Sequence, residues 1–187
     1  MNLSFSPSID IIFGPMFSGK TSEIIRRIII YHEMALKVLY INSLSDDRSD
    51  NAFSTHNSTI GRIPFESIKV EKLADCDVTG YDVIAIDESQ LFSDLKEVVI
   101  HWCETLKKIV IVAGLNGDFQ RKPFGQINSL IPYSDNIIKL TPFCMSCKRE
   151  KNTIKQAIFT KRTVNNSETV LIGGKDLYIP VCRECFN

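Results

Sequence analysis

The 187-residue sequence has no surplus charge of either sign and no long apolar run. Lysine plus arginine and aspartate plus glutamate both total 22, so the formal net charge is zero. A protein that coats nucleic acid needs a basic excess to displace counterions, and this balance argues against that class. The uninterrupted apolar stretches are only as long as strands, whereas a membrane span needs ~20 residues. We therefore expect neither nucleic acid nor a membrane as a partner.

The N-terminal stretch, MNLSFSPSID, has neither the positive flank nor the apolar centre of an export signal. A cytoplasmic location is therefore expected. In that compartment the six cysteines are expected to be reduced thiols or metal ligands and not disulfides. The length suits one ordinary domain with a small appendage.

Short β-branched runs alternate with helical patterns along most of the chain. The runs are nearly unbroken, as in strands buried on both faces of a sheet, and they lie at residues 9–13, 37–42, 81–87, 108–115 and 136–140. Helical spacing is found at residues 22–35 and 94–107. Strand–helix alternation predicts an α/β fold with a parallel sheet flanked by helices. Residues 43–80 are polar and irregular, and we interpret them as a surface excursion.

The character of the chain changes after about residue 141. The remaining residues lack a long helical pattern and hold four of the six cysteines. We predict two domains, a larger α/β domain over residues 1–141 and a smaller, cysteine-containing domain over residues 142–187.

The stretch FGPMFSGKTSEII directly follows an apolar run and leads into a helical pattern. It fits the spacing G-x-x-x-x-G-K-[ST] of a phosphate-binding loop, in which main-chain N–H groups wrap a polyphosphate, the lysine reaches its terminal groups and the last hydroxyl binds Mg²⁺. A plain glycine turn before a helix is the simpler alternative. The flanking strand and helix favour a P-loop (RecA-like) fold, with ATP bound by Gly14, Pro15, Met16, Phe17, Ser18, Gly19, Lys20 and Thr21.

Two carboxylates, Asp87 and Glu88, follow the third predicted strand. In a P-loop fold an acidic residue at the end of a neighbouring strand helps to hold Mg²⁺, and the next carboxylate can take a proton from the group that attacks the γ-phosphate. A solvated acidic helix start is the alternative. As a base, Glu88 would activate either water, as in an ATPase, or a substrate hydroxyl, as in a kinase. These residues leave both reactions open.

Two C-x-x-C pairs, Cys144 with Cys147 and Cys182 with Cys185, lie in the last quarter of the chain. Four thiolates meet the tetrahedral demand of structural Zn²⁺, which would hold both ends of the long loop between the pairs. Redox chemistry at one pair is the alternative. That motif opens a helix after a strand, and we expect neither pair to do so. Cys76 and Cys103 have no partner at metal spacing and are interpreted as small buried residues.

Further motifs follow the phosphate loop in a fixed order: DDR at 46–48, IDESQLF, GLNGDFQRKPF, PFCMSC, FTKR, LIGGKDLY and VCREC. Together with GPMFSGKT they resemble the cytosolic, zinc-containing (type II) thymidine kinases of animals, bacteria and large DNA viruses. The resemblance covers nearly the whole chain. FQRKPF and IGGKDLY are far more specific than the phosphate loop, because a generic ATPase has no need of them. In length the chain is closest to the viral and microbial members.

The resemblance implies transfer of the γ-phosphate of ATP to the 5′-hydroxyl of thymidine, with deoxyuridine a poorer substrate and Glu88 as the base. It extends the binding of ATP and Mg²⁺ from the loop to Asp46, Asp47, Arg48, Asp87, Glu88, Ser89 and Gln90. It assigns the nucleoside to Phe119, to a lasso made of Thr169, Val170, Leu171, Ile172, Gly173 and Tyr178, and to Met16, Leu115 and Thr160 near the thymine methyl group. It also implies feedback inhibition by dTTP and a homotetramer.

Two positions depart from the family pattern. Leu91 stands where a second aromatic residue is usual, and Asn116 stands where aspartate is usual. Neither belongs to the motifs that the chemistry needs. The alternative to a deoxynucleoside kinase is a P-loop ATPase whose zinc knuckles bind nucleic acid, with Glu88 activating water. The neutral charge and FQRKPF weigh against it.

Overall fold

The structure, a computed structural model, describes residues 5–46, 65–165, 171, 173, 174 and 176–187. Its main sheet has six strands in the order β3-β2-β4-β5-β1-β6, and every pair is parallel. The strands are β1 Ser8–Phe13, β2 Val38–Ser43, β3 Glu66–Val70, β4 Val83–Ile86, β5 Ile109–Gly114 and β6 Asn136–Lys139. The predicted α/β class with a parallel sheet is confirmed.

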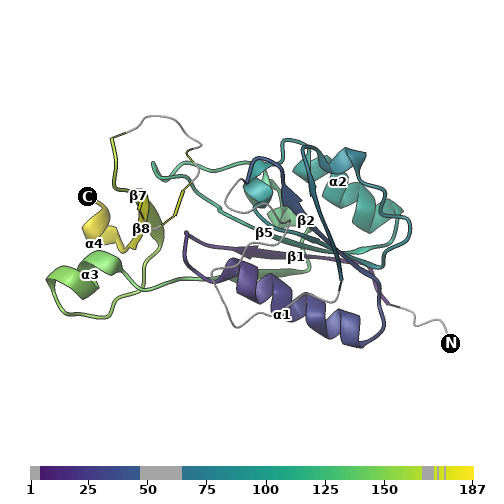
Figure 1. The fold of residues 1–187 in the computed structure, drawn as a ribbon, viewed down its shortest axis with the longest axis horizontal. Helices are drawn as coiled ribbons and strands as arrows, with labels where there is room; N and C mark the ends of the chain where they lie inside the picture. Colours follow the sequence, from purple (N-terminus) through teal and green to yellow (C-terminus); the bar gives the residue numbers. More distant parts are fainter. Residues whose placement is uncertain (1–4, 47–64, 166–170, 172, 175) are drawn as a thin grey trace.

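Two helices cover opposite faces of this sheet (Figure 1). Helix α1 (Lys20–Glu33) buries Ile24, Ile25 and Ile28 in an apolar cluster with alternate residues of the central strands. Helix α2 (Leu95–Ile100) covers the other face and buries Leu95 and Val99 in a second cluster. The strand residues of this cluster alternate with those that face α1. Because successive side chains of a strand point to opposite faces, a strand covered on both sides must be apolar at nearly every position. This explains the unbroken β-branched runs.

The helical pattern over residues 94–107 does not form one regular helix. After α2 the chain widens into a π-helical turn, η3 (His101–Thr105), in which Leu106 N–H donates to the carbonyl of His101 at 3.1 Å. The wider turn buries Trp102 and Cys103 together, while Leu106 remains 36% exposed. The helical spacing predicted over residues 94–107 therefore does not bring Leu106 into the buried core. Shorter 3₁₀ segments are η1 Leu73–Asp75, η2 Ser89–Leu91 and η4 Ile127–Tyr133.

The two edge strands differ from the expectation. Strand β3 lies within the segment that we interpreted as an irregular excursion, and it pairs only with β2. Its sequence, ESIKV, has too few apolar residues to be recognised because an edge strand is covered incompletely. Strand β6 does have an apolar run, yet Ile137 is 45% exposed. Burial on both faces therefore holds for the central strands and not for β6.

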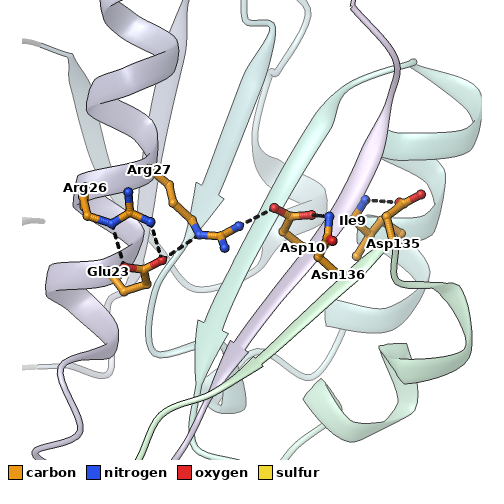
Figure 2. Close-up of polar contacts among 7 residues, drawn as sticks. All are labelled: Ile9, Asp10, Glu23, Arg26, Arg27, Asp135 and Asn136. Atoms are coloured by element: carbon orange, nitrogen blue, oxygen red, sulfur yellow. Dashed lines mark hydrogen bonds and ion pairs between the residues drawn. The ribbon is translucent and has the colours of Figure 1, made fainter.

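A polar network connects α1 and β6 to the central strand β1 (Figure 2). Asp10 is a buried carboxylate in β1 that accepts from Arg27 of α1 at 2.5 Å and from the Asn136 side chain at 2.9 Å. Arg27 also donates to Glu23 at 2.9 Å, and Asp135 accepts from a main-chain N–H of β1 at 2.8 Å. Paired charges of this kind avoid the large cost of a lone buried carboxylate.

Helix α3 (Met145–Glu150), the antiparallel strands β7 (Phe159–Arg162) and β8 (Tyr178–Val181), and helix α4 (Arg183–Phe186) form a separate C-terminal unit. Figure 1 shows this unit at one end of the sheet. Its buried cluster consists of Cys144, Cys147, Ala157, Val181 and Cys182. Throughout the described part of the chain, no helix combines the length and the apolar content that a membrane span requires.

Candidate active site and metal centre

The predicted phosphate loop connects β1 to α1, as the motif requires. Gly14 is needed there because a Cβ atom would lie 2.1 Å from the carbonyl oxygen of Leu140, and Gly19 has a φ of 87°, which favours glycine. Lys20 is buried, and its ammonium group donates to the carbonyl of Pro15 at 3.1 Å. The loop is thus folded around the lysine side chain.

One main-chain donor of this loop is engaged within the protein. The N–H of Met16 donates to the hydroxyl of Thr160 in β7 at 2.9 Å. This bond connects the phosphate loop to the C-terminal unit, although 144 residues separate the two partners. Thr160, predicted only as a neighbour of the substrate, therefore also holds the loop.

Asp87 follows β4 and lies beside the first turn of α1. It is buried, and it accepts from the phenol of Tyr40 at 2.9 Å. Burial raises the pKa of Asp87, the neighbouring Glu88 charge adds to the rise, and the nearby hydroxyl groups of Thr21 and Tyr40 oppose it. A divalent cation at this carboxylate would favour its charged form. The oxygen atoms of Asp87 and Thr21 are the hard donors that Mg²⁺ prefers.

Glu88 has a φ of 47°, an uncommon conformation for a residue other than glycine. Its carboxylate accepts from the Gln90 amide at 2.6 Å, and the oxygen of the same amide accepts from Leu115 N–H at 2.9 Å. Gln90 is buried and thereby holds Glu88 against the residue that follows β5. Strained backbone and fixed side-chain partners of this kind are frequent in active sites.

A single cavity contains Glu88 together with most of the predicted nucleoside residues. The predicted residues that line it are Met16, Asp46, Glu88, Gln90, Leu115, Phe119, Thr160, Leu171, Gly173 and Tyr178. Asp47, Arg48, Thr169, Val170 and Ile172 lie outside the described residues. The cavity thus joins the phosphate loop, Glu88, the loop after β5 and the C-terminal unit.

Leu91, which stands where the family usually has an aromatic residue beside the pocket, also lines this cavity. Three further lining residues had no role assigned from the sequence: Gly117, Asp118 and Phe124. Asp118 is buried, and its carboxylate accepts from the N–H groups of Gln120 and Lys122, both at 2.8 Å. It therefore closes the turn that presents Phe119. The motif GDFQRKPF contains Asp118 and Phe124, so its specific spacing was the available signal. The departure Asn116 contributes its main-chain carbonyl, which accepts from Asn128 at 2.7 Å.

The four cysteines of the two C-x-x-C pairs form one cluster. Their sulfur atoms all lie within 4.8 Å of one another, with Cys147 Sγ at 3.7 Å from Cys182 Sγ and at 3.5 Å from Cys185 Sγ. Zn–S bonds of about 2.3 Å in a tetrahedron place sulfur atoms about 3.8 Å apart, so the cluster fits zinc. Burial, with the neighbouring thiols, raises the pKa of Cys147 to about 12, and a cation would offset the cost of ionising the group.

Our expectation that neither C-x-x-C pair opens a helix after a strand is wrong for the second pair. Cys182 directly follows β8 and caps helix α4, so this pair does open a short helix after a strand. The convergence of all four sulfur atoms is what favours a metal. Cys103 is a small buried residue as expected, and Cys76 is half-buried against the same core.

Comparison with known proteins agrees with this geometry. The sequence model of the thymidine kinase family matches residues 7–186. The thymidine kinase of vaccinia virus (strain Western Reserve) is 42% identical over 183 residues, which is 95% of this chain and 96% of the relative. The thymidine kinases of monkeypox virus and raccoon poxvirus are each 41% identical, again over 95% of this chain and 96% of the relative. The chain therefore belongs to the thymidine kinase family.

Proposed function

We propose that this protein is a thymidine kinase that transfers the γ-phosphate of ATP to the 5′-hydroxyl of thymidine, giving dTMP and ADP. The observation that carries the proposal is the shared cavity, which brings Met16 of the phosphate loop and Glu88 together with Phe119, Leu171 and Tyr178. A nucleoside held there has its reacting hydroxyl between a candidate base and a candidate phosphate site.

On the phosphate side, the loop and Lys20 bind the triphosphate, helped by Asp46, Asp47 and Arg48. Mg²⁺ would be held by Thr21 and Asp87, and when bound it neutralises charge on the transferring phosphoryl group. The buried Lys20 adds a second positive charge at the same place. This arrangement is supported by the position of the loop between β1 and α1 and by the buried carboxylate of Asp87 at the end of the neighbouring strand β4.

On the acceptor side, Glu88 takes the proton of the thymidine 5′-hydroxyl. As the proton leaves, the 5′-oxygen of thymidine forms a bond to the γ-phosphorus. The bond from that phosphorus to the β,γ-bridging oxygen breaks, and ADP leaves with the electron pair. Gln90 orients Glu88, because its amide donates to the carboxylate while its oxygen is held by Leu115 N–H. The fixed position lowers the cost of aligning the base.

The base side uses a flat apolar contact and main-chain groups. Phe119 packs on the thymine ring, and Met16, Leu115 and Thr160 lie near its methyl group, as their places in the cavity allow. Main-chain groups of the lasso, residues 169–173, read the N3–H and carbonyl edge. In the proposed second domain, residues 142–187, zinc bound by the four cysteines holds both ends of the lasso segment.

We further propose dTTP as a feedback inhibitor and a homotetramer as the assembly. A thymidine triphosphate carries both the base for the cavity and the phosphates for the loop, so one molecule would block both sites.

The homotetramer would cover apolar side chains that remain exposed on β6 and on or directly after α1. They are Ile30 at 46%, Met34 at 51% and Ile137 at 45%. Light scattering that finds a monomer at working concentration would refute the tetramer.

A substrate comparison tests the proposed function. ADP release is measured with thymidine, deoxyuridine, deoxycytidine or single-stranded DNA added separately to the protein and ATP–Mg²⁺. We expect thymidine to be best, deoxyuridine poorer and deoxycytidine nearly inert, because cytosine would leave buried edge groups unpaired at about 1–3 kcal/mol each. ADP release stimulated by DNA alone would instead support the ATPase alternative.

A further inference from the structure

We propose that Arg162 is a positioning residue that holds the two walls of the nucleoside cavity together, an inference that rests on the proposed function. Arg162 is the last residue of β7 and is not itself part of the cavity lining. Its guanidinium group nevertheless contacts two residues that do line the cavity, one in the wall formed by the turn after β5 and one in the wall formed by the C-terminal unit. One contact is with Phe119 and the other is with Tyr178.

On the first wall, the central carbon of the guanidinium lies 3.7 Å from the centre of the Phe119 ring. A planar cation at this distance stacks on one face of the ring, which leaves the other face for a flat base. Phe119 comes from the turn closed by Asp118, and no strand holds its side chain. The cation therefore restricts the orientation of an aromatic ring that lies in a turn and not in a strand.

On the second wall, Arg162 donates to the phenol oxygen of Tyr178 at 2.7 Å. The phenol in turn donates to the main-chain carbonyl of Leu171, also at 2.7 Å. Tyr178 is buried, and both Tyr178 and Leu171 line the cavity. The chain of contacts Phe119–Arg162–Tyr178–Leu171 thus runs from one wall to the other.

The chemistry of this chain needs arginine at its centre. A guanidinium group offers a flat face for Phe119 and in-plane N–H donors for Tyr178 at the same time. A lysine keeps the positive charge but is a point donor that cannot stack and donate in perpendicular directions. Substitution by lysine therefore separates the positioning role from the charge. Arg162 contacts residues that line the nucleoside cavity and lies outside the phosphate loop. Its substitution is therefore expected to raise the KM for thymidine more than the KM for ATP.

The test compares Arg162→Lys with Arg183→Lys. Arg183 also places its guanidinium over a phenylalanine of β7, Phe159 at 5.3 Å, but it does not line the nucleoside cavity. We expect Arg162→Lys to raise the KM for thymidine about tenfold, with kcat, the KM for ATP and the zinc content changed less than twofold. Arg183→Lys is expected to leave all four within twofold. The proposal would be overturned if Arg162→Lys kept a thymidine KM within twofold of that of the unmodified protein. It would also be overturned if the KM values for thymidine and ATP rose by the same factor.

A double-mutant cycle with Tyr178→Phe tests the coupling, and the Tyr178→Phe variant alone tests the proposal where Arg162→Lys folds poorly. Tyr178→Phe removes the link between Arg162 and Leu171 while keeping the ring, and we expect it alone to raise the thymidine KM several-fold. In the double variant the increase should be much smaller than the product of the single increases, because both changes break one chain. Multiplicative increases, or an unchanged KM in Tyr178→Phe, would contradict the inference. The unmodified protein is assayed alongside, so failure of the proposed function would appear as no thymidine phosphorylation at all.

Discussion

The sheet body and the C-terminal unit are stabilised by different means. The body has two clusters of buried apolar side chains, one on each face of the sheet, and both are built from several strands and a helix. The C-terminal unit has a buried cluster of five residues, three of them cysteines. A unit of this size rarely buries enough apolar surface to fold alone. The body is therefore expected to be stable without metal, and the C-terminal unit is not.

The sheet body and the C-terminal unit also have different roles. In the proposed mechanism the body supplies the phosphate loop and the base, and the C-terminal unit supplies the residues that enclose the nucleoside. The two meet at the bond between Met16 and Thr160 and at the contact between Phe119 and Arg162. Damage to the C-terminal unit should therefore abolish nucleoside binding while leaving the body folded.

Removal of zinc should produce the largest effect. In Cys144→Ser, or after chelation, we expect loss of one zinc per chain, unfolding of the C-terminal unit and no detectable thymidine phosphorylation. The sheet body should stay folded, and the single tryptophan, Trp102, is a suitable reporter because it is buried in the core beneath α2. Metal analysis and tryptophan fluorescence measure the two parts separately.

The matched control for zinc removal is Cys76→Ser, which changes a half-buried cysteine outside the cluster. It should keep its zinc and its activity. Protein purified without chelators that contains no zinc, or that has a disulfide between the two pairs, would contradict the assignment of the cluster.

Glu88→Gln should give the next largest effect. The amide keeps the shape of the side chain but cannot accept a proton, and loss of a general base typically lowers the rate by ~10²–10⁴. ATP and thymidine should still bind, because the walls of the cavity are unchanged. Steady-state kinetics measure kcat, and calorimetric titration measures the two affinities. Glu71→Gln, at an exposed glutamate of the body, serves as the control, and a near-normal kcat in Glu88→Gln would exclude the base assignment.

Lys20→Ala should separate the two substrates within the body. The ammonium group of Lys20 lies in the phosphate loop, and a hydrogen bond to a charged group contributes about 1.5–3 kcal/mol, so we expect roughly 10–100-fold weaker use of ATP. Thymidine affinity should change little. Lys37→Ala, at an exposed lysine before β2, is the control. Equal loss of both affinities would indicate that the substitution has damaged the fold.

The central strands and the cysteine cluster could be predicted from the sequence because each is encoded locally. Runs such as IVIVAG of β5 are apolar throughout since both faces are covered, and the C-x-x-C spacing presents two metal ligands at once. Strand β3 could not be predicted, because its few apolar residues reflect a partial cover that depends on the position of β2.

The residues missed in the candidate site act through distant partners. Tyr40 bonds to Asp87, 47 positions away, and Arg162 stacks on Phe119 across two separate elements. Nothing in the local pattern around a tyrosine in a buried strand or an arginine at a strand end indicates such a partner. Gln90 was assigned to ATP, whereas its observed bonds are to Glu88 and Leu115. Resemblance identified the region, and only the structure shows the contacts.

Glu23→Gln should give the smallest effect and tests whether the body depends on charge as well as on apolar burial. Hydrogen bonds from Arg26, partly opposed by burial, and from Arg27 lower the pKa of Glu23 to about 2. The Arg26 side chain is 60% exposed, so solvent screening limits the contribution of Glu23 to about 1 kcal/mol. A carboxylate with a lowered folded-state pKa stabilises the folded protein above its unfolded-state pKa of 4.5, and this stabilisation is lost as the pH falls toward 2.

Urea unfolding should thus show that Glu23→Gln is less stable than the unmodified protein at pH 7 and nearly as stable near pH 2.5. Glu33→Gln, at the exposed end of α1, is the control and should show no such pH-dependent difference in the free energy of unfolding. If the difference for Glu23→Gln is the same at pH 7 and at pH 3, the shape of the side chain and not its charge matters at this position.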